Sequence, residues 1–405
     1  MDDRAGIRKI VTRASTGVRV ANFLRLLLAL VVFVVSLLAI FPAPTNLAWQ
    51  LSIGVTEWGH ALALFALLLL LPGWGRTTSG RISAFLALTS VLLALSPLLQ
   101  ASPIAQALPG QLASAFGGRN PRDGRGAPAR SIPLVYRDLF TGVRSPSVRI
   151  DTATYVTRNG KPLGLDLYRP VNPPLGLLPL VVVIHGGSWH GGSRSGLPEL
   201  NRYLAARGYA VAAVSYRFAP ENPHPAASND VHSAIRFLKA NARGLGLDGT
   251  RIVLIGRSAG GQLALLEAYT AKDPSIRGAA AFYAPSDQVF GYENPSNPRI
   301  LNSTGILEAY LAGNPRTVPE AYRTASPINF VNGSTVPTLL IHGGKDEIVW
   351  VRQSERLDAK LAAAKRPHFF LRLPWATHGC DYNFNGPCGQ LSTYAIENFL
   401  GEVMR

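Results

Sequence analysis

The chain has 405 residues, of which 47% are hydrophobic, and a formal net charge of +16 at pH 7. This length suggests two structural units. The charge would suit nucleic-acid binding, but the basic residues are scattered and become dense only in the N-terminal arm and one linker, which argues against a folded nucleic-acid-binding module. The two cysteines are too few for a zinc site or a disulfide framework.

Three apolar runs predict a membrane region near the N-terminus. They cover residues 22–41, 51–71 and 82–99, and about twenty apolar residues span a bilayer as a helix. A signal peptide is the alternative for the first run, although two further apolar runs follow it. The second run is also compatible with a re-entrant or interfacial helix, and we interpret its Glu57 and His60 as a solvated end near the outer membrane surface.

The distribution of positive charge predicts the orientation of this region. The N-terminal arm is basic, the loop at 42–50 has no Lys or Arg, and the next loop, with Arg76, is basic again. We therefore expect a cytoplasmic N-terminus and an extracytoplasmic globular domain. Because residues 101–146 are rich in Pro, Gly, Ser and Arg, they predict a linker between a membrane region at 1–100 and a globular domain at 147–405.

The globular domain shows short apolar strands that alternate with helices, which predicts a mostly parallel sheet flanked by helices. Asn159-Gly160 lies between two alternating segments and predicts a β-hairpin. An irregular insertion at about 286–335 interrupts the alternation, and we expect it to form a cap over the end of the sheet.

The main candidate for chemistry is a strand-to-helix turn with the sequence Gly256-Arg257-Ser258-Ala259-Gly260. A G-x-S-x-G turn lifts its serine hydroxyl above the edge of the sheet, and flanking glycines avoid clashes there. The helix that follows directs the positive end of its dipole toward the same place, which suits a developing oxyanion. A glycine-rich turn with a structural serine is the alternative.

A serine nucleophile needs a base, and the base needs an acid that orients it. Asp346 follows a buried strand that ends in Gly-Gly, and we prefer it as the acid to Glu347 and Asp287, although it could instead cap a helix. His378 is the only one of the eight histidines with the order and setting expected of the base. A surface histidine without a role is the alternative.

A second glycine-rich loop, His185-Gly186-Gly187-Ser188-Trp189, follows an earlier strand and could turn backbone N–H groups toward the oxyanion. Together with the serine turn, the acid and the base, this loop resembles the α/β-hydrolase superfamily, nearest to small carboxylesterases, hormone-sensitive-lipase-like enzymes and arylformamidases. Lipase-type loops usually read His-Gly-Gly-Gly, so the Ser-Trp pair here is closer to the arylformamidase and feruloyl-esterase-like pattern. The resemblance covers about residues 150–405.

This resemblance implies the α/β-hydrolase fold and a role for each candidate. Ser258 would be the nucleophile, His378 the base and Asp346 its orienting acid. The oxyanion hole would consist of three backbone N–H groups, those of Gly187, Ser188 and Ala259.

Cys380 and Cys388 lie just after His378, and the short loop between them could close a disulfide. Outside the cytoplasm such a bridge would stiffen the loop that holds the base. Two free thiols are the alternative.

The sequence thus predicts a membrane-anchored serine hydrolase that cleaves acetyl or short- to medium-chain carboxylic esters through an acyl-enzyme. Its expected partners are a small ester and the lipid bilayer, with no metal, cofactor or nucleic acid. Alternatives on the same triad are an arylformamidase, another amide or peptide hydrolase, or an acyltransferase. An alternative of another class is an inactive, membrane-tethered binding protein.

Overall fold

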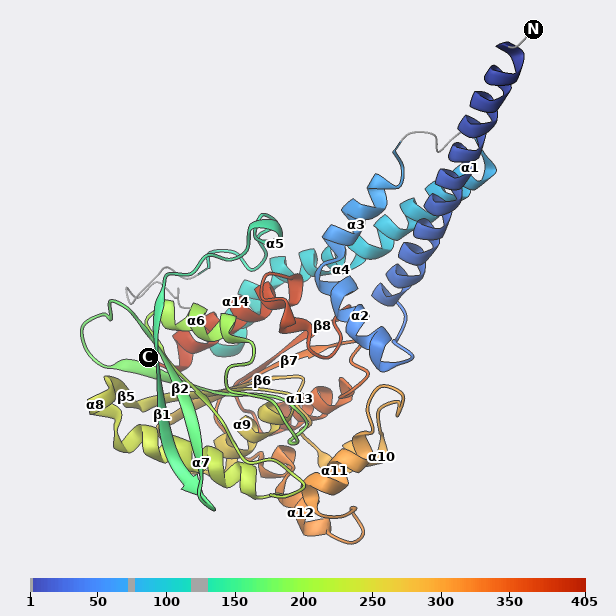
Figure 1. The fold of residues 1–405 in the computed structure, drawn as a ribbon. Coiled ribbons are helices and arrows are strands. Elements are labelled where there is room, and N and C mark those ends of the chain that lie inside the picture. Colours follow the sequence, from blue (N-terminus) through green and yellow to red (C-terminus); the bar gives the residue numbers. More distant parts are fainter. Residues whose placement is uncertain (1–2, 72–76, 118–129) are drawn as a thin grey trace.

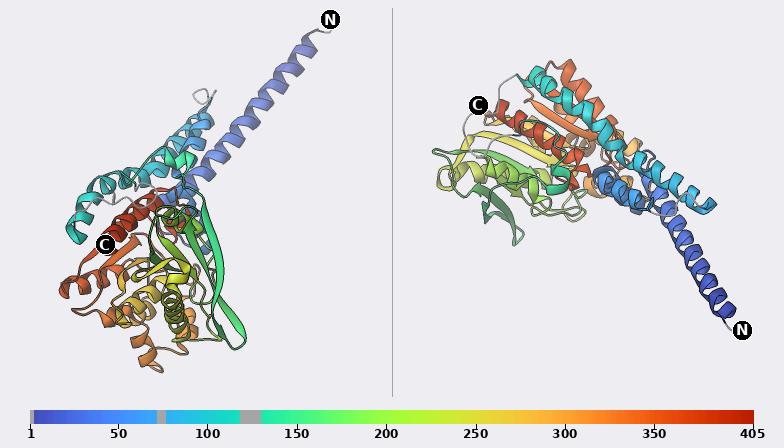
Figure 2. Two further views of the ribbon diagram at one scale, coloured as in Figure 1. Left: turned by 90° about the vertical axis from the view of Figure 1, so that its left-hand side faces the viewer. Right: turned by 90° about the horizontal axis from the view of Figure 1, so that it is seen from above.

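The computed structural model describes residues 3–71, 77–117 and 130–405. Long N-terminal helices project from a globular body that is built around one sheet (Figure 1). Two further views show the first helix leading away from this body (Figure 2). Outside the described residues lie 72–76, in the loop predicted to be basic, and 118–129, in the predicted linker.

The sheet has eight strands in the spatial order β1-β2-β4-β3-β5-β6-β7-β8. Their bounds are Val148–Arg158 (β1), Lys161–Pro170 (β2), Leu178–Ile184 (β3), Ala210–Val214 (β4), Leu247–Arg257 (β5), Ile276–Phe282 (β6), Thr338–Gly343 (β7) and His368–Leu373 (β8). The pairs β1–β2 and β2–β4 are antiparallel, whereas every pair from β4 to β8 is parallel. The prediction of a mostly parallel sheet is confirmed.

Local sequence explains both parts of the sheet. Central parallel strands are buried on both faces and need continuous apolar residues, and every residue of Leu178–Ile184 is buried. The hairpin turns at Asn159-Gly160, whose φ angles of 48° and 74° suit a two-residue type I′ turn. The predicted hairpin is confirmed by the pairing of Arg158 with Lys161.

Helices cover both faces of the sheet. One face carries α7 (Ala226–Ala240), α9 (Ala259–Thr270) and α13 (Arg352–Ala363). The other face carries α6 (Pro198–Ala206), α14 (Pro387–Val403) and the C-terminal part of α4 (Thr78–Phe116). Short helices in the connections are α5 (Asp138–Thr141) and α8 (Ala242–Leu245).

The predicted insertion follows β6 and contains short helices. These are α10 (Gln288–Glu293), α11 (Ser303–Leu311), α12 (Pro319–Thr324) and the 3-10 turn η2 (Pro327–Phe330). In Figure 1 they form one end of the globular body, beside the region where the parallel strands finish.

Two of the predicted membrane spans correspond to long apolar helices. The first helix, α1 (Asp3–Ser36), continues into the 3-10 turn η1 (Leu37–Ala39), and its stretch Val20–Ala39 is long and apolar enough to cross a membrane. The helix α4 meets the same criterion. In Figure 1, α1 and α4 run toward the globular body side by side. The short helix α3 runs in the opposite direction and packs against α4.

The second predicted span is not one continuous helix. It forms α2 (Asn46–Glu57) and α3 (Gly59–Leu68), which meet at an angle of 85° around Trp58. Glu57 is buried against the globular body, and α3 lies so close to α4 that a Cβ on Gly59 would come within 2.0 Å of the Ala94 carbonyl oxygen. The end of α2 is therefore attached to the globular body, whereas α3 packs against α4.

The predicted linker also differs from the structure, because α4 continues to Phe116. Its C-terminal part places Ala101, Ala105, Leu108 and Leu112 in the core beneath the sheet. This spacing of three to four residues forms one apolar helix face, which holds the helix together despite Pro103 and Pro109. The predicted boundary at residue 100 therefore falls inside a helix that belongs to both parts of the molecule.

Candidate active site

The serine turn has the strained geometry expected of a nucleophile. β5 ends at Arg257, α9 begins at Ala259, and Ser258 between them has φ 54° and ψ −122°. A Cβ on Gly256 would lie 2.0 Å from the carbonyl oxygen of Gly260, so a side chain cannot be accommodated there. Strain of this kind is characteristic of functional turns.

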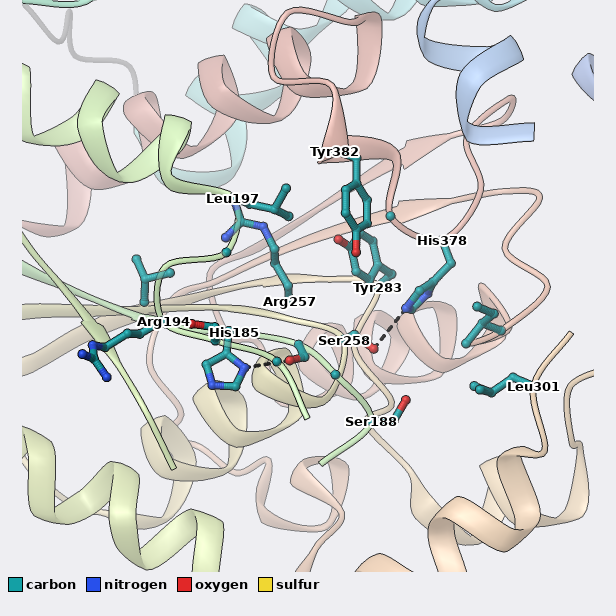
Figure 3. Close-up of a pocket in the computed structure, with 18 of the residues that line it drawn as sticks. His185, Ser188, Arg194, Leu197, Arg257, Ser258, Tyr283, Leu301, His378 and Tyr382 are labelled. Carbon is teal, nitrogen blue, oxygen red and sulfur yellow. Dashed lines mark hydrogen bonds between the residues drawn. The ribbon is translucent and has the colours of Figure 1, made fainter. Parts of the chain in front are cut away.

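The structure brings together the three residues predicted as a triad. His378 Nε2 lies 3.0 Å from Ser258 Oγ (Figure 3), and His378 Nδ1 lies 2.7 Å from Asp346 Oδ2. These are hydrogen-bond distances, and the residues come from β5–α9, the loop after β7 and the loop after β8. Their alignment along one path suits proton transfer from the hydroxyl to the imidazole.

Asp346 is held in its ionised form. Burial alone would raise the pKa of this carboxyl group, but His378 and His342 together outweigh it and lower the pKa to about 2. The other carboxylate oxygen accepts hydrogen bonds from the backbone N–H groups of Ile348 and Val349, at 2.9 and 2.8 Å. The carboxylate can therefore orient His378 throughout the neutral pH range.

The two rival acids have other partners. Glu347 accepts hydrogen bonds from the Thr377 hydroxyl and from the backbone N–H of Ala43 in the N-terminal region. Asp287 caps α10 and pairs with Arg356 at 2.7 Å. Neither carboxylate contacts the imidazole of His378.

The predicted oxyanion residues surround the serine. Gly187 and Ser188 line the same cavity as Ser258, and Ala259 is the first residue of α9. Gly187 has φ 124°, and a Cβ there would lie 2.2 Å from the carbonyl oxygen of Gly191, so the tight loop requires glycine. Trp189, two residues further along, donates a hydrogen bond from its indole N–H to the side-chain oxygen of Gln262 at 2.9 Å.

Two cavities meet at Ser258. The larger has a volume of about 290 Å³ and includes His378, Tyr382 and Leu197 in its wall. The smaller, of about 60 Å³, lies beside Ala259 and is lined by apolar and polar side chains of the insertion, such as Ile306 and Asn294. The side chain of Ser258 therefore lies where the two cavities join. Among the described residues, no group of three His, Cys, Asp or Glu side chains is arranged to hold a metal ion.

Sequence reasoning missed a buried ionic network behind the triad. Arg257, the variable residue of the turn, pairs with Asp381, which also accepts a hydrogen bond from the Tyr283 hydroxyl. The ring of Tyr283 lies 4.3 Å from that of His378. An arginine between a buried strand and a buried helix requires a partner, and this requirement was the signal that could have pointed to Asp381.

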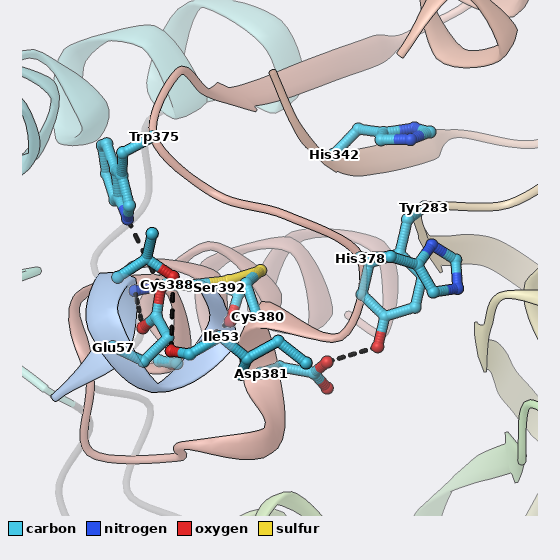
Figure 4. The surroundings of a disulfide bond; sticks show 12 residues. Ile53, Glu57, Tyr283, His342, Trp375, His378, Cys380, Asp381, Cys388 and Ser392 are labelled. Carbon is cyan, nitrogen blue, oxygen red and sulfur yellow. Dashed lines mark hydrogen bonds between the residues drawn. A yellow bond between two sulfur atoms is a disulfide. The ribbon is translucent and has the colours of Figure 1, made fainter. Parts of the chain in front are cut away.

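A disulfide joins Cys380 to Cys388 in the loop after His378 (Figure 4). The loop is also held by Glu57 of α2, whose carboxylate accepts a hydrogen bond from the Cys388 backbone N–H at 3.0 Å, while Trp375 Nε1 lies 3.4 Å from it. Glu57 is fully buried, so its interpretation as a solvated end is wrong. His60 is also buried, against Phe140.

Comparison with known proteins finds relatives of the globular part of the chain. Residues 165–361 match the BD-FAE family. The chain is 33% identical over 259 residues to "Esterase LipC" of Mycobacterium tuberculosis, covering 60% of this chain and 62% of that protein. It is 30% identical over 259 residues to "Probable carboxylic ester hydrolase LipM" of the same organism, covering 60% and 59%. The chain thus spans about three fifths of the length of these relatives.

Solved structures show the same fold. An esterase from Pyrobaculum calidifontis superposes with a TM-score of 0.56 at 25% identity, covering 64% of this chain and 86% of that one. A bacterial heroin esterase superposes with a TM-score of 0.55 at 22% identity, covering 64% and 85%. Both matches leave about a third of this chain uncovered.

Proposed function

We propose that the globular part of this chain, which has the α/β-hydrolase fold, is a serine hydrolase of carboxylic esters, anchored in a membrane by its N-terminal helices. The observation that carries the proposal is the continuous path from Ser258 through His378 to Asp346, with distances of 3.0 and 2.7 Å. The names of its relatives as esterases support the reaction class.

The proposed reaction has two steps. As Ser258 Oγ attacks the ester carbonyl, its proton passes to His378 Nε2, and Asp346 stabilises the imidazolium that forms. The backbone N–H groups of Gly187, Ser188 and Ala259 bind the oxyanion. The imidazolium then protonates the alcohol as it leaves, and a water molecule activated by the same imidazole hydrolyses the acyl-enzyme.

The two cavities suggest which side of the ester each one receives. The imidazole must reach the leaving oxygen, and His378 lines the larger cavity, so we assign the alcohol to that side. The acyl group then enters the smaller cavity, of about 60 Å³, between Trp189 and the insertion residues Ile306 and Leu307. This volume suits acetyl and other short acyl groups.

The proposed topology follows the charges and the helix directions. The basic N-terminal arm would stay in the cytoplasm, α1 would cross outward, the bent pair α2–α3 would lead back, and α4 would cross outward again. The globular domain would then be extracytoplasmic, where a disulfide such as Cys380–Cys388 persists.

Labelling with a fluorophosphonate probe tests the proposal. The full-length protein in detergent micelles should be labelled covalently, and Ser258→Ala should abolish the labelling, because the probe reacts only with an activated serine. Absence of labelling in the wild-type protein would favour an inactive binding protein instead.

Two further experiments distinguish the alternative reactions. Comparing the turnover of an ester with that of an N-formyl aromatic amide separates an esterase from an arylformamidase. Product analysis with added alcohols detects acyl transfer.

A further inference from the structure

The N-terminal region touches the globular body beside the triad. Trp49 of α2 donates a hydrogen bond from Nε1 to the backbone carbonyl of His378, at 3.2 Å. Asn46, at the start of the same helix, donates from its backbone and side chain to the carbonyl oxygens of Arg299 and Ile300, both at 3.0 Å. The start of α2 therefore bridges the insertion and the loop that carries the base.

Two further contacts fasten the segment before α2. The Lys345 ammonium group donates to the carbonyl oxygen of Leu38 at 2.6 Å, and the backbone N–H of Ala43 donates to Glu347 at 2.9 Å. Both partners adjoin Asp346, so the chain that leaves α1 is attached on either side of the triad acid.

The same helix forms part of the wall of the larger cavity. Asn46 and Trp49 line it together with His378, Tyr382 and Leu301. The cavity proposed for the alcohol is therefore bounded on one side by the globular domain and on another by the region proposed to lie at the membrane.

The outer surface around this wall is apolar. Phe41 is 57% exposed, and Leu47 and Leu51 of α2 are 66% and 43% exposed. These side chains continue the exposed apolar surface of Val20–Ala39 toward the cavity. Apolar surface of this kind favours contact with a lipid phase, and it lies next to the cavity wall formed by Trp49.

From this arrangement, and resting on the proposed function, we propose that the substrate is a bilayer-resident lipid, namely a long-chain alcohol that carries a short acyl group. The acyl group occupies the small cavity beside Ala259. The alkyl chain of the alcohol leaves the larger cavity past Trp49 and stays in contact with the membrane. On this view α2 is a specificity-determining element as well as part of the anchor.

The test uses two acetate esters, so that the acyl group is constant. Full-length protein in phosphatidylcholine vesicles is given p-nitrophenyl acetate in water or hexadecyl acetate within the bilayer. We expect Trp49→Ala to lower kcat/KM for hexadecyl acetate, relative to p-nitrophenyl acetate, by about tenfold or more, which corresponds to the loss of one apolar contact. Trp49→Phe should restore most of this ratio because it retains an aromatic wall.

The matched control is Leu64→Ala, which removes an exposed apolar side chain from the neighbouring helix α3, outside both the cavity wall and the surface formed by Phe41, Leu47 and Leu51. Its ratio should stay within about twofold of the wild-type value. Hydrolysis of p-nitrophenyl acetate with an unchanged ratio in Trp49→Ala, or a preference for methyl hexadecanoate over hexadecyl acetate, would overturn this inference and leave the esterase assignment intact. Failure to hydrolyse either acetate, together with the absence of fluorophosphonate labelling, would contradict both this inference and the proposed esterase function.

Discussion

The two sides of the site are built in different ways. On the side of the serine turn, backbone geometry dictates the arrangement, since Gly256 and Gly187 occupy positions where a Cβ would lie 2.0 and 2.2 Å from backbone oxygens. On the side of α2, the contacts join distant parts of the chain, such as the Trp49 side chain and the backbone carbonyl of His378, which are 329 residues apart. The chemistry is therefore encoded in local motifs, whereas the shape of the pocket depends on how two regions pack.

Removing the nucleophile is the strongest test of the side built by backbone geometry. Ser258→Ala should lower kcat for p-nitrophenyl acetate by about 10⁴-fold or more, since the remaining groups cannot form an acyl-enzyme. Because the hydroxyl is replaced by hydrogen in a turn that keeps its glycines, the melting temperature should change little. Activity at more than about a tenth of the wild-type level would show that another group performs the reaction.

The second test distinguishes the triad acid from its neighbour. Asp346→Asn should lower kcat by about 10⁴-fold, because the amide favours the wrong tautomer of His378. Glu347→Gln, at the next residue, should cost less than about tenfold, since its contacts are with Thr377 and Ala43. Steady-state kinetics of both variants at pH 7 decide the assignment, and equal losses would contradict it.

These two sides also differ in how far the sequence predicted them. Ser258, Asp346 and His378 could be proposed because each follows a recognisable strand in a fixed order along the chain, and the hairpin at Asn159-Gly160 because two residues determine its turn. Such features depend on neighbours in the sequence. They required no knowledge of which distant segments meet.

The N-terminal contacts could not be predicted in this way. Glu57 looked like the polar end of a span, because its partner Cys388 lies 331 residues further along the chain. The C-terminal part of α4 looked like a linker because of Pro103 and Pro109, although the apolar spacing from Ala101 to Leu112 was visible. Composition favoured one interpretation and periodicity the other, and packing against the sheet decided between them.

The third test breaks the packing between the two regions. Glu57→Leu should lower the free energy of unfolding by about 2 kcal/mol, because the buried backbone N–H of Cys388 loses its acceptor. For a domain of this size the loss corresponds to about 4–8 °C in melting temperature, measurable by thermal unfolding in detergent. Glu57→Gln keeps an acceptor oxygen and should lose less, so equal losses would show that this hydrogen bond is unimportant.

The smallest expected effect concerns a contact between the insertion and the rest of the globular domain. His224 lies against Tyr310 and Thr324, and burial lowers the pKa of its imidazole to about 4. Between pH 4 and its ordinary value of 6.5, the unfolded chain binds a proton that the folded protein does not, so the free energy of unfolding falls as the pH falls through this window. For a partly exposed ring we expect a loss on the order of 1 to 2 kcal/mol.

Substituting His224 separates its contribution to the pH dependence of stability from the contributions of other acidic and basic groups. His224→Gln cannot take up the proton, so its melting temperature should fall less than that of the wild-type protein between pH 7 and pH 4.5. Because Glu57 contacts Cys388 and Trp375 rather than His224 or the insertion, Glu57→Leu should leave this difference unchanged, as expected for separate sites whose effects add. If the melting temperature falls equally with pH in His224→Gln and in the wild-type protein, the neutral imidazole of His224 does not contribute to holding the insertion in place.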